Sequence, residues 1–245
     1  MAEIKRIFLT GAPGSRWSKI DRYIRACTRF KTDNTDINEK RNWRGHRGAY
    51  WNPGNEPGYD WILDFDSYTK EHIVETLDSV FRPPPLSVEK IVRVHKSHHF
   101  AYHLDKIREL FPDAAIVIVS QPPHLCLLWW EICGGHDTVF DSYHYYKRDY
   151  DLIWDQIITQ NNAIDKFIEK NNLEKNYINL PTLEKYFGVL NPSFIEKFLK
   201  PRRVKNEDFD SLLTITEPDW YQLYGTGLEV DHKISIVPWK ENRNY

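Results

Sequence analysis

The sequence predicts a three-layer α/β/α fold with a central parallel sheet, and two observations carry this prediction. The apolar run at residues 7–9 ends in a Gly/Pro/Ser turn that opens into a helix-like segment. Residues 90–133 alternate strand, short helix, strand and helix, which is the rhythm of βαβ units. In a sheet of this kind, ligands bind at the carboxyl ends of the strands.

The first third of the chain holds a strand at 7–9, a helix at 18–30 and a polar segment at 31–60. A segment this long is usually functional or disordered. Its tryptophans and basic residues favour an ordered lid or a loop that contacts substrate, and a surface loop without a role is the alternative. Residues 61–65 are expected to be a short strand or an entry segment to the next helix. A helix at 68–81 has an apolar stripe, and the prolines at 83–85 end it.

The remaining elements follow from similar patterns. Residues 90–95 alternate as a strand, 102–111 have a helical period, and 114–119 are apolar without interruption, as strands buried on both faces are. Helices are expected at 125–133, 149–172, 182–187 and 192–199, a short strand at 177–180, and irregular structure at 200–245. The 245 residues are interpreted as a single domain with a sizeable core.

Composition narrows the functional classes. A net charge of −2 and a pI near 6.6 argue against a dedicated nucleic-acid binder. Three scattered cysteines do not make a disulfide framework, and 35 aromatic residues (9 Trp, 14 Tyr and 12 Phe) argue against disorder. No signal-peptide pattern and no apolar run long enough to span a bilayer is present in the sequence. We therefore expect a soluble, cytoplasmic protein with neither a membrane nor a nucleic acid as its partner.

The turn after the first strand has the features of a phosphate-binding loop. Amides at the start of a helix and the helix dipole favour an anion, and glycine lets the backbone wrap closely around it. The serines add hydroxyl donors and the arginine adds a charge. The loop lacks the Gly-Lys-Ser/Thr of nucleoside triphosphatases, so an ordinary strand–turn–helix connection is the alternative. The candidate cofactor-binding residues are Gly11, Ala12, Pro13, Gly14, Ser15, Arg16, Trp17 and Ser18.

This loop resembles the Pro-Lys/Arg-Ser-Gly-Thr-Thr loop of sulfotransferases. Pro13, Ser15 and Ser18 occupy the positions of the proline, the serine and the last hydroxyl residue. The basic residue of that motif corresponds to Gly14 and its glycine to Arg16, so the basic charge is displaced by two positions.

Two further segments resemble the same family in the same order. Lys96-Ser97-His98 is similar to the Lys-Thr-His segment of cytosolic-type sulfotransferases, and residues 119–122 are similar to their Arg-x-Pro turn. Ser120 follows His98 by 22 positions (120 − 98), about the family spacing. The resemblance covers roughly residues 1–135, and the chain is similar in style to short, phage-encoded members of the family.

The resemblance implies a P-loop-type sulfotransferase fold and transfer of a sulfonate from 3′-phosphoadenylyl sulfate (PAPS) to a hydroxyl or amine acceptor, a small molecule or a glycan. It implies that His98 is the catalytic base and that Lys96 lies beside the sulfonate. The aromatic segment at 43–61 could line the acceptor pocket or stack on the adenine. The family's 3′-phosphate-binding arginine corresponds to Ser120, and its partner serine corresponds to Leu128. Arg202, Arg203 and Lys205 could replace the lost charge, and so could Arg41, Arg44 or Arg47.

Other interpretations stay open. The chain could be a non-catalytic sulfotransferase-like module, or a nucleotide-dependent phosphotransferase. His98 and Lys96 could be surface residues at the end of a strand. Histidines at positions 95, 98, 99 and 103 could ligate zinc, but a strand and a helix separate them, and no metal site is predicted. Trp129 and Trp130 are expected to belong to the core.

Overall fold

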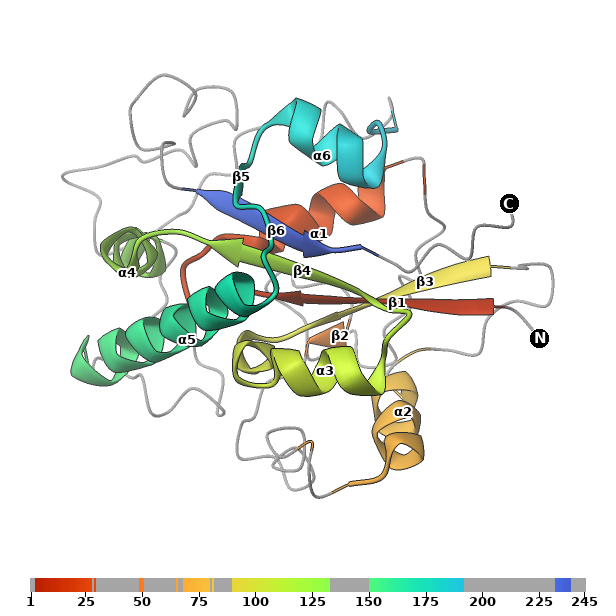
Figure 1. Cartoon of the computed structure of the whole chain (residues 1–245). Helices are drawn as coiled ribbons and strands as arrows, with labels where there is room; N and C mark the ends of the chain where they lie inside the picture. Colours follow the sequence, from red (N-terminus) through yellow and green to blue (C-terminus); the bar gives the residue numbers. More distant parts are fainter. Residues whose placement is uncertain are drawn as a thin grey trace.

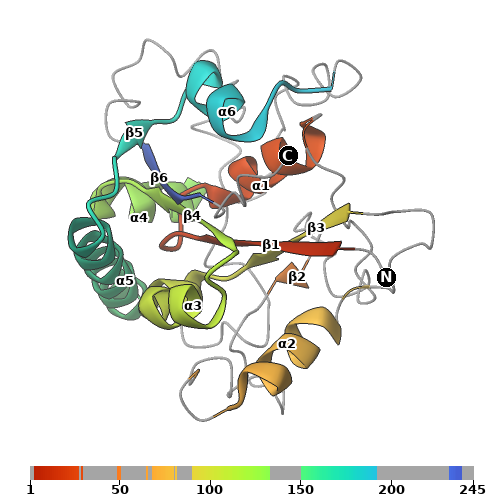
Figure 2. The ribbon, with the colours of Figure 1, turned by 45° about the vertical axis from the view of Figure 1, so that its right-hand side comes forward.

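The computed structural model describes residues 3–27, 29, 49–50, 65, 68–79, 81, 90–132, 150–191 and 232–238. Within these residues the protein is of the α/β class, with one mixed sheet and helices on both of its faces (Figures 1 and 2). The expected loop at 31–60 lies outside the described residues except for 49–50, as do the helix expected at 192–199 and most of 200–245. The strand expected at 61–65 is described only at Phe65.

In the described part of the chain, six strands form the sheet, in the order β2-β3-β1-β4-β6-β5. Their bounds are Glu3–Thr10 for β1, Ala49–Tyr50 for β2, Lys90–Lys96 for β3, Ala115–Ser120 for β4, Asn176–Tyr177 for β5 and Lys233–Val237 for β6. The strands from β2 to β4 pair in parallel, whereas β6 is antiparallel to β4 and β5 is antiparallel to β6. The α/β prediction is confirmed, but the sheet is mixed: its parallel part runs from β2 to β4, and β6 and β5 add an antiparallel edge.

Strand β6 also corrects the expectation of irregular structure at 200–245. It pairs with β4 from Ser120↔Lys233 to Ile116↔Val237. Only Ile234 and Ser235 of its five residues are buried, so no continuous apolar run marks the strand in the sequence. A long-range pairing with β4 makes this segment a strand, and local propensity is a weak guide to such strands.

Strand β1 lies near the centre of the sheet, and the strands that follow it in the chain are added first on one side of it and then on the other. From β1 the chain continues to β3 on one side and then crosses to β4 on the other side. The carboxyl ends of these three strands, at Thr10, Lys96 and Ser120, therefore lie at one edge of the sheet. Ligands of open α/β sheets bind at such a reversal point.

The helices flank this sheet (Figure 1). They are α1 (Trp17–Ala26), α2 (Lys70–Ser79), the 3₁₀ helix η3 (His98–Tyr102), α3 (Leu104–Leu110), α4 (Pro123–Ile132), α5 (Tyr150–Lys170) and α6 (Leu180–Phe187). Each α-helix lies close to a predicted helix, whereas η3, apart from Tyr102, lies where no helix was predicted. None of the helices in the described part of the chain combines the length and the hydropathy that a bilayer crossing requires.

Local capping explains the two boundaries that differ most from the prediction. The helix expected at 102–111 is preceded by η3, because the Ser97 Oγ accepts from the His99 N–H at 3.1 Å and turns the chain directly after β3. The strand expected at 177–180 ends at Tyr177. The Asn179 Oδ1 accepts from the Thr182 N–H at 2.8 Å and starts α6 there.

Side chains that alternate along the strands form two hydrophobic cores, one on each face of the sheet. In β1, Phe8 faces one side and Ile7 and Leu9 face the other. The Phe8 side packs against α2, η3, α3 and α5, and the Ile7 side packs against α1 and α6 (Figure 2). Trp129 and Trp130 are both buried, as expected of core residues. Trp130 joins α4 to α5 and to Ala12 in a third, smaller cluster.

Candidate functional site

The loop between β1 and α1 has an unusual backbone. The N–H of Ser15 donates to the carbonyl of Ala12 at 2.9 Å, which closes a tight turn. Gly14 has a φ of 75° and Arg16 has a φ of 63°, in the left-handed region that arginine rarely adopts. A Cβ on Gly14 would lie 1.8 Å from the carbonyl oxygen of Cys126, so packing against α4 also requires glycine there. Strained backbone of this kind is frequent at ligand-binding sites.

Two side chains from distant parts of the sequence hold the carbonyls of this loop. The Gln121 Nε2 donates to the Gly14 oxygen at 2.7 Å, and the His232 Nε2 lies 2.9 Å from the Ser15 oxygen. In a trans peptide the N–H points away from the carbonyl, so these contacts fix the direction of the amides that follow. The first amides of α1 have no acceptor within the helix. The loop therefore presents the amides of a helix start, a geometry that can hold an anion.

The Ser15 hydroxyl adds an unmet hydrogen-bonding group to this loop. It is fully buried, and no partner for its Oγ is present in the described structure. It lies over the start of the loop, because a Cβ placed on Gly11 would come 2.3 Å from it. Burial of an unpaired hydroxyl is costly, and an oxygen of a bound anion would remove that cost.

Arg16 gives the loop its positive charge. The guanidinium carbon lies 4.0 Å above the ring of Trp129, which is close enough for a cation–π contact that orients the side chain. Pro13 is buried in the turn, and the backbone of Ser18 belongs to the first turn of α1, whereas its side chain lies outside the described residues. All eight loop positions predicted from the sequence thus lie together at the carboxyl end of β1.

His98 directly contacts this loop. Its Nδ1 lies 2.6 Å from the carbonyl oxygen of Gly11 and 3.0 Å from the indole nitrogen of Trp17, which faces the imidazole edge-on. The ring is buried, with 7% exposure. Burial lowers the pKa of His98 to about 4, although the contact with Gly11 opposes this shift. The imidazole is therefore neutral near pH 7, which is the form that accepts a proton, but a pKa of about 4 makes it a weaker base than an ordinary histidine.

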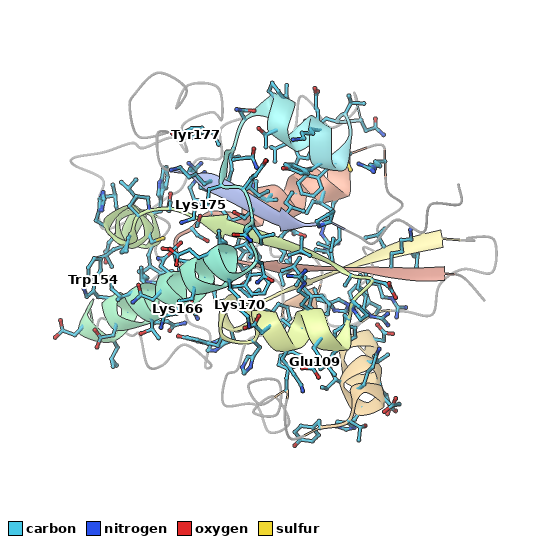
Figure 3. All side chains as sticks on the ribbon, viewed as in Figure 1. Glu109, Trp154, Lys166, Lys170, Lys175 and Tyr177 are labelled. Carbon is cyan, nitrogen blue, oxygen red and sulfur yellow. The ribbon has the colours of Figure 1, made fainter. Side chains whose placement is uncertain are left out.

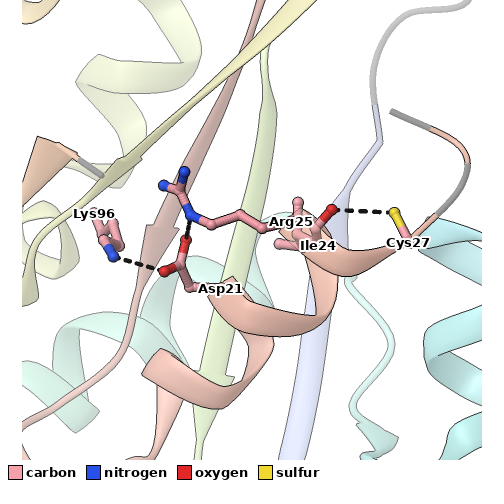
Figure 4. Close-up of polar contacts among 5 residues, drawn as sticks. All are labelled: Asp21, Ile24, Arg25, Cys27 and Lys96. Atoms are coloured by element: carbon pink, nitrogen blue, oxygen red, sulfur yellow. Dashed lines mark hydrogen bonds and ion pairs between the residues drawn. The ribbon is translucent and has the colours of Figure 1, made fainter. Parts of the chain in front are cut away.

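Lys96 is placed differently from the sulfonate-facing position that the resemblance implies. The side chain is fully buried, and its Nζ donates to the Asp21 Oδ2 at 2.6 Å (Figure 4). The Arg25 Nε holds the other carboxylate oxygen at 2.7 Å. Burial lowers the pKa of Lys96 to about 8, against the opposing effect of Asp21. Burial also disfavours the Asp21 carboxylate, but Arg25 and Lys96 outweigh this and hold its pKa below the usual value.

Ser120 lies where the resemblance expects an arginine. It is 9% exposed at the end of β4, and the sheet places Lys233 of β6 directly opposite it. The Lys233 Nζ lies 5.3 Å from the ring centroid of Tyr177, which is the next residue in the same row across the sheet. Leu128, in the position of the expected serine, is 43% exposed on α4.

The other histidines of the cluster lie in different surroundings from His98. His95 lies in the core between Phe8, which stacks on it, and Phe81, which meets it edge-on. His99 is the second residue of η3, and His103 is its C-cap residue. Among the described residues, no group of three or more His, Cys, Asp or Glu side chains is arranged to hold a metal ion.

Sequence reasoning did not identify three residues that shape the site. Asp21 has a recognisable signal, because it precedes Arg25 by one helical turn. Gln121 is adjacent to Ser120 but was not singled out. His232 has no local signal, since its contact with Ser15 spans 217 positions.

No protein-family model, no curated protein and no solved structure matches this chain. A functional proposal therefore rests on the residues at the carboxyl edge of the sheet and on their resemblance to the sulfotransferase segments.

Proposed function

We propose that this protein is a sulfotransferase that moves a sulfonate from PAPS to a hydroxyl or amine acceptor, on a sheet of the P-loop sulfotransferase kind. One observation carries the proposal: the candidate base is attached to the candidate anion loop. The His98 Nδ1 is 2.6 Å from the Gly11 oxygen, at the first residue of that loop. A proton acceptor and an anion site that share one edge of the sheet are what in-line transfer to an acceptor needs.

The phosphosulfate end of PAPS fits the loop. The first amides of α1, the buried Ser15 hydroxyl and the guanidinium of Arg16 supply donors and positive charge. Glycine is needed at positions 11 and 14 because neighbouring protein atoms already occupy the space of a Cβ. A Cβ on Gly11 would collide with Ser15 and Val119, and a Cβ on Gly14 would collide with Cys126. The donor set thus suits an anion at the helix start, and the glycines give the loop its shape.

The 3′-phosphate end requires a different solution from the family's arginine. Ser120 is neutral, but the register of β4 and β6 sets Lys233 opposite it. Lys233 therefore brings a cation to the same row of the sheet, from a strand outside the region that resembles sulfotransferases. We assign to Lys233 the electrostatic part of 3′-phosphate binding.

PAPS, when bound, would supply an activated sulfonate whose sulfur–oxygen bond to the 5′-phosphate breaks as the bond from sulfur to the acceptor forms. In this step His98 takes the acceptor's proton on Nε2, because its Nδ1 faces Gly11. Arg16 and the amides of α1 stabilise the negative charge on the departing phosphate. Lys96 holds α1 against β3 through Asp21 and so orients the helix whose start binds the anion.

A binding module without catalysis is the second candidate, and the geometry of Lys96 favours it. The amine is fully buried in a pair with Asp21, so this cation is held by protein. The place of the expected arginine is taken by Ser120. Such a module would bind the nucleotide at the same loop but would not need the base.

Calorimetric titration with 3′-phosphoadenosine 5′-phosphate (PAP), AMP and ATP–Mg²⁺ tests nucleotide binding. The proposal expects micromolar binding of PAP and weaker binding of AMP, which lacks the 3′-phosphate. Arg16→Ala and Ser15→Ala should weaken both, whereas Lys233→Ala should remove only the preference for PAP. Lys166→Ala, on the exposed face of α5 (Figure 3), is the control. Binding of ATP–Mg²⁺ alone would favour a phosphotransferase, and binding of none would refute the proposal.

His98→Ala separates the enzyme from the binding module. An enzyme loses turnover of PAPS with a screened acceptor but keeps its affinity for PAP. If PAP binds and PAPS is never turned over by the wild type, the binding module is the better description.

A further inference from the structure

His98 has two competing partners at one ring nitrogen. Its Nδ1 lies 2.6 Å from the Gly11 carbonyl oxygen and 3.0 Å from the Trp17 Nε1. A carbonyl oxygen can only accept and an indole N–H can only donate. A protonated Nδ1 therefore bonds to Gly11, and an unprotonated Nδ1 bonds to Trp17. The two contacts call for opposite tautomers of the neutral ring.

The Gly11 contact is fixed by the sheet. Next to it, the Thr10 Oγ1 donates to the Ser97 oxygen at 2.8 Å, and the Ser97 N–H donates to the Leu9 oxygen at 3.2 Å. These bonds tie the end of β1 to the end of β3 directly before the contact. At 2.6 Å an unprotonated nitrogen would set its lone pair against that of the carbonyl oxygen. A proton between the two atoms turns this repulsion into a short hydrogen bond.

Trp17 acts in the opposite direction. Its indole is 3% exposed, and its ring centroid is 5.2 Å from that of His98 at an interplanar angle of 72°. The indole is therefore held with its N–H toward Nδ1. A proton on Nδ1 would face the indole hydrogen, which disfavours that tautomer, whereas the tautomer with the proton on Nε2 accepts from Trp17.

We infer that the Gly11 carbonyl keeps the proton of His98 on Nδ1, which leaves Nε2 as the base, and that Trp17 is a positioning residue that opposes this tautomer and so sets the competent fraction. This inference deepens the proposed function, because the competent tautomer is the one that can take a proton from an acceptor at Nε2. It predicts an unusual sign. Loss of a buried hydrogen bond to the candidate base should increase the competent fraction.

Nitrogen NMR of the full-length protein measures this fraction directly. Ring-¹⁵N-histidine labelling gives the shifts of Nδ1 and Nε2 at pH 7, and His98→Gln assigns them. We expect the wild type to show mainly the Nδ1–H tautomer. In Trp17→Phe the ratio of Nδ1–H to Nε2–H should rise roughly 2- to 10-fold, the value of one hydrogen bond. Trp154→Phe, on α5 (Figure 3), is the matched control and should change nothing.

Thr10→Val is a second variant that acts on the other partner. It removes the bond from Thr10 to Ser97 that anchors Gly11, and it should shift the ratio toward Nε2–H. A wild type that is mainly Nε2–H, or a Trp17→Phe ratio that falls or stays constant, would overturn the inference. Because this readout needs no substrate, it stands apart from the proposed function. If sulfonate transfer occurs, kcat of Trp17→Phe should rise only as far as the Nδ1–H fraction does, because the wild type is already mainly in that tautomer.

Discussion

Asp21→Asn should lower the free energy of unfolding by about 3–5 kcal/mol, because it leaves a buried lysine without its counter-charge. Lys96 is fully buried, and its Nζ is 2.6 Å from the Asp21 carboxylate. Even with this carboxylate in place, burial lowers the pKa of Lys96 from 10.5 to about 8. That difference corresponds to a penalty of about 3 kcal/mol on the charged amine. Loss of the carboxylate's charge must increase the penalty.

Lys96→Met should cost less than about 1 kcal/mol, since it replaces the buried amine with an apolar chain of similar length and leaves Asp21 bonded to Arg25. The double variant should therefore recover most of the loss caused by Asp21→Asn. Urea unfolding at pH 7 measures all three variants. Asp165→Asn is the control, because Asp165 and its partner Lys175 are exposed and their pair should contribute under 1 kcal/mol.

The pH dependence provides a second test of the same pair. The folded pKa of Lys96, about 8, lies below its unfolded value of 10.5, so the unfolded chain binds more protons between these pH values. The stability contribution of Lys96 should therefore rise with pH by up to about 3 kcal/mol across this window, and Lys96→Met should abolish the rise. Two results would refute the buried pair: a loss of unfolding free energy in Lys96→Met equal to that in Asp21→Asn, or an unchanged pH dependence in Lys96→Met. Lys96 would then be exposed to solvent or available to the sulfonate.

Three further predictions concern the loop and its surroundings. Gly14→Ala should destabilise the protein by about 3 kcal/mol in urea unfolding and abolish PAP binding, because φ is 75° and the new Cβ would meet the Cys126 oxygen at 1.8 Å; unchanged binding would contradict the loop geometry. Stability should fall as the pH drops below 6.5, by about 1.4 kcal/mol per pH unit for each buried histidine. Burial lowers the pKa of His95 well below 6.5, that of His98 to about 4 and that of His99 to about 3. In an acid titration His98→Gln should reduce the slope, and an equal slope would contradict this assignment. Burial raises the pKa of the Cys126 thiol to about 12, so mass spectrometry should find it unmodified by iodoacetamide in the native protein at pH 8; rapid modification would exclude the buried position.

The parts of the fold that sequence predicted are those that local patterns determine. The apolar run of β4 and the alternation of β3 were recognisable because side-chain burial follows a simple period in each. The same holds for α5, whose apolar residues recur at helical spacing over 21 residues. By contrast, β6 is a strand because β4 offers it an unpaired edge, and that information is absent from its own five residues.

In the candidate site too, features set by the local sequence were predictable and features set by long-range contacts were not. The turn at Gly14 and the strand-end position of His98 were predicted, since glycine and the end of an apolar run are local signals. The partner of Lys96 could not be predicted, because it depends on which face of α1 lies on the sheet. Gln121 and His232 became part of the loop only through contacts over 107 and 217 positions, respectively.

These distant contacts imply that the loop is shaped before any ligand arrives. The positive φ of Arg16 is a cost of order 1 kcal/mol that an isolated turn would avoid. Here bonds from Gln121 and His232 fix the carbonyls on either side of the Ser15 peptide, and the close packing of Gly14 on Cys126 fixes the position of the turn. A site that is held in this way loses little conformational entropy on binding. His232→Ala should therefore weaken PAP binding without contacting PAP, because the strained loop would relax when one of its two supports is removed.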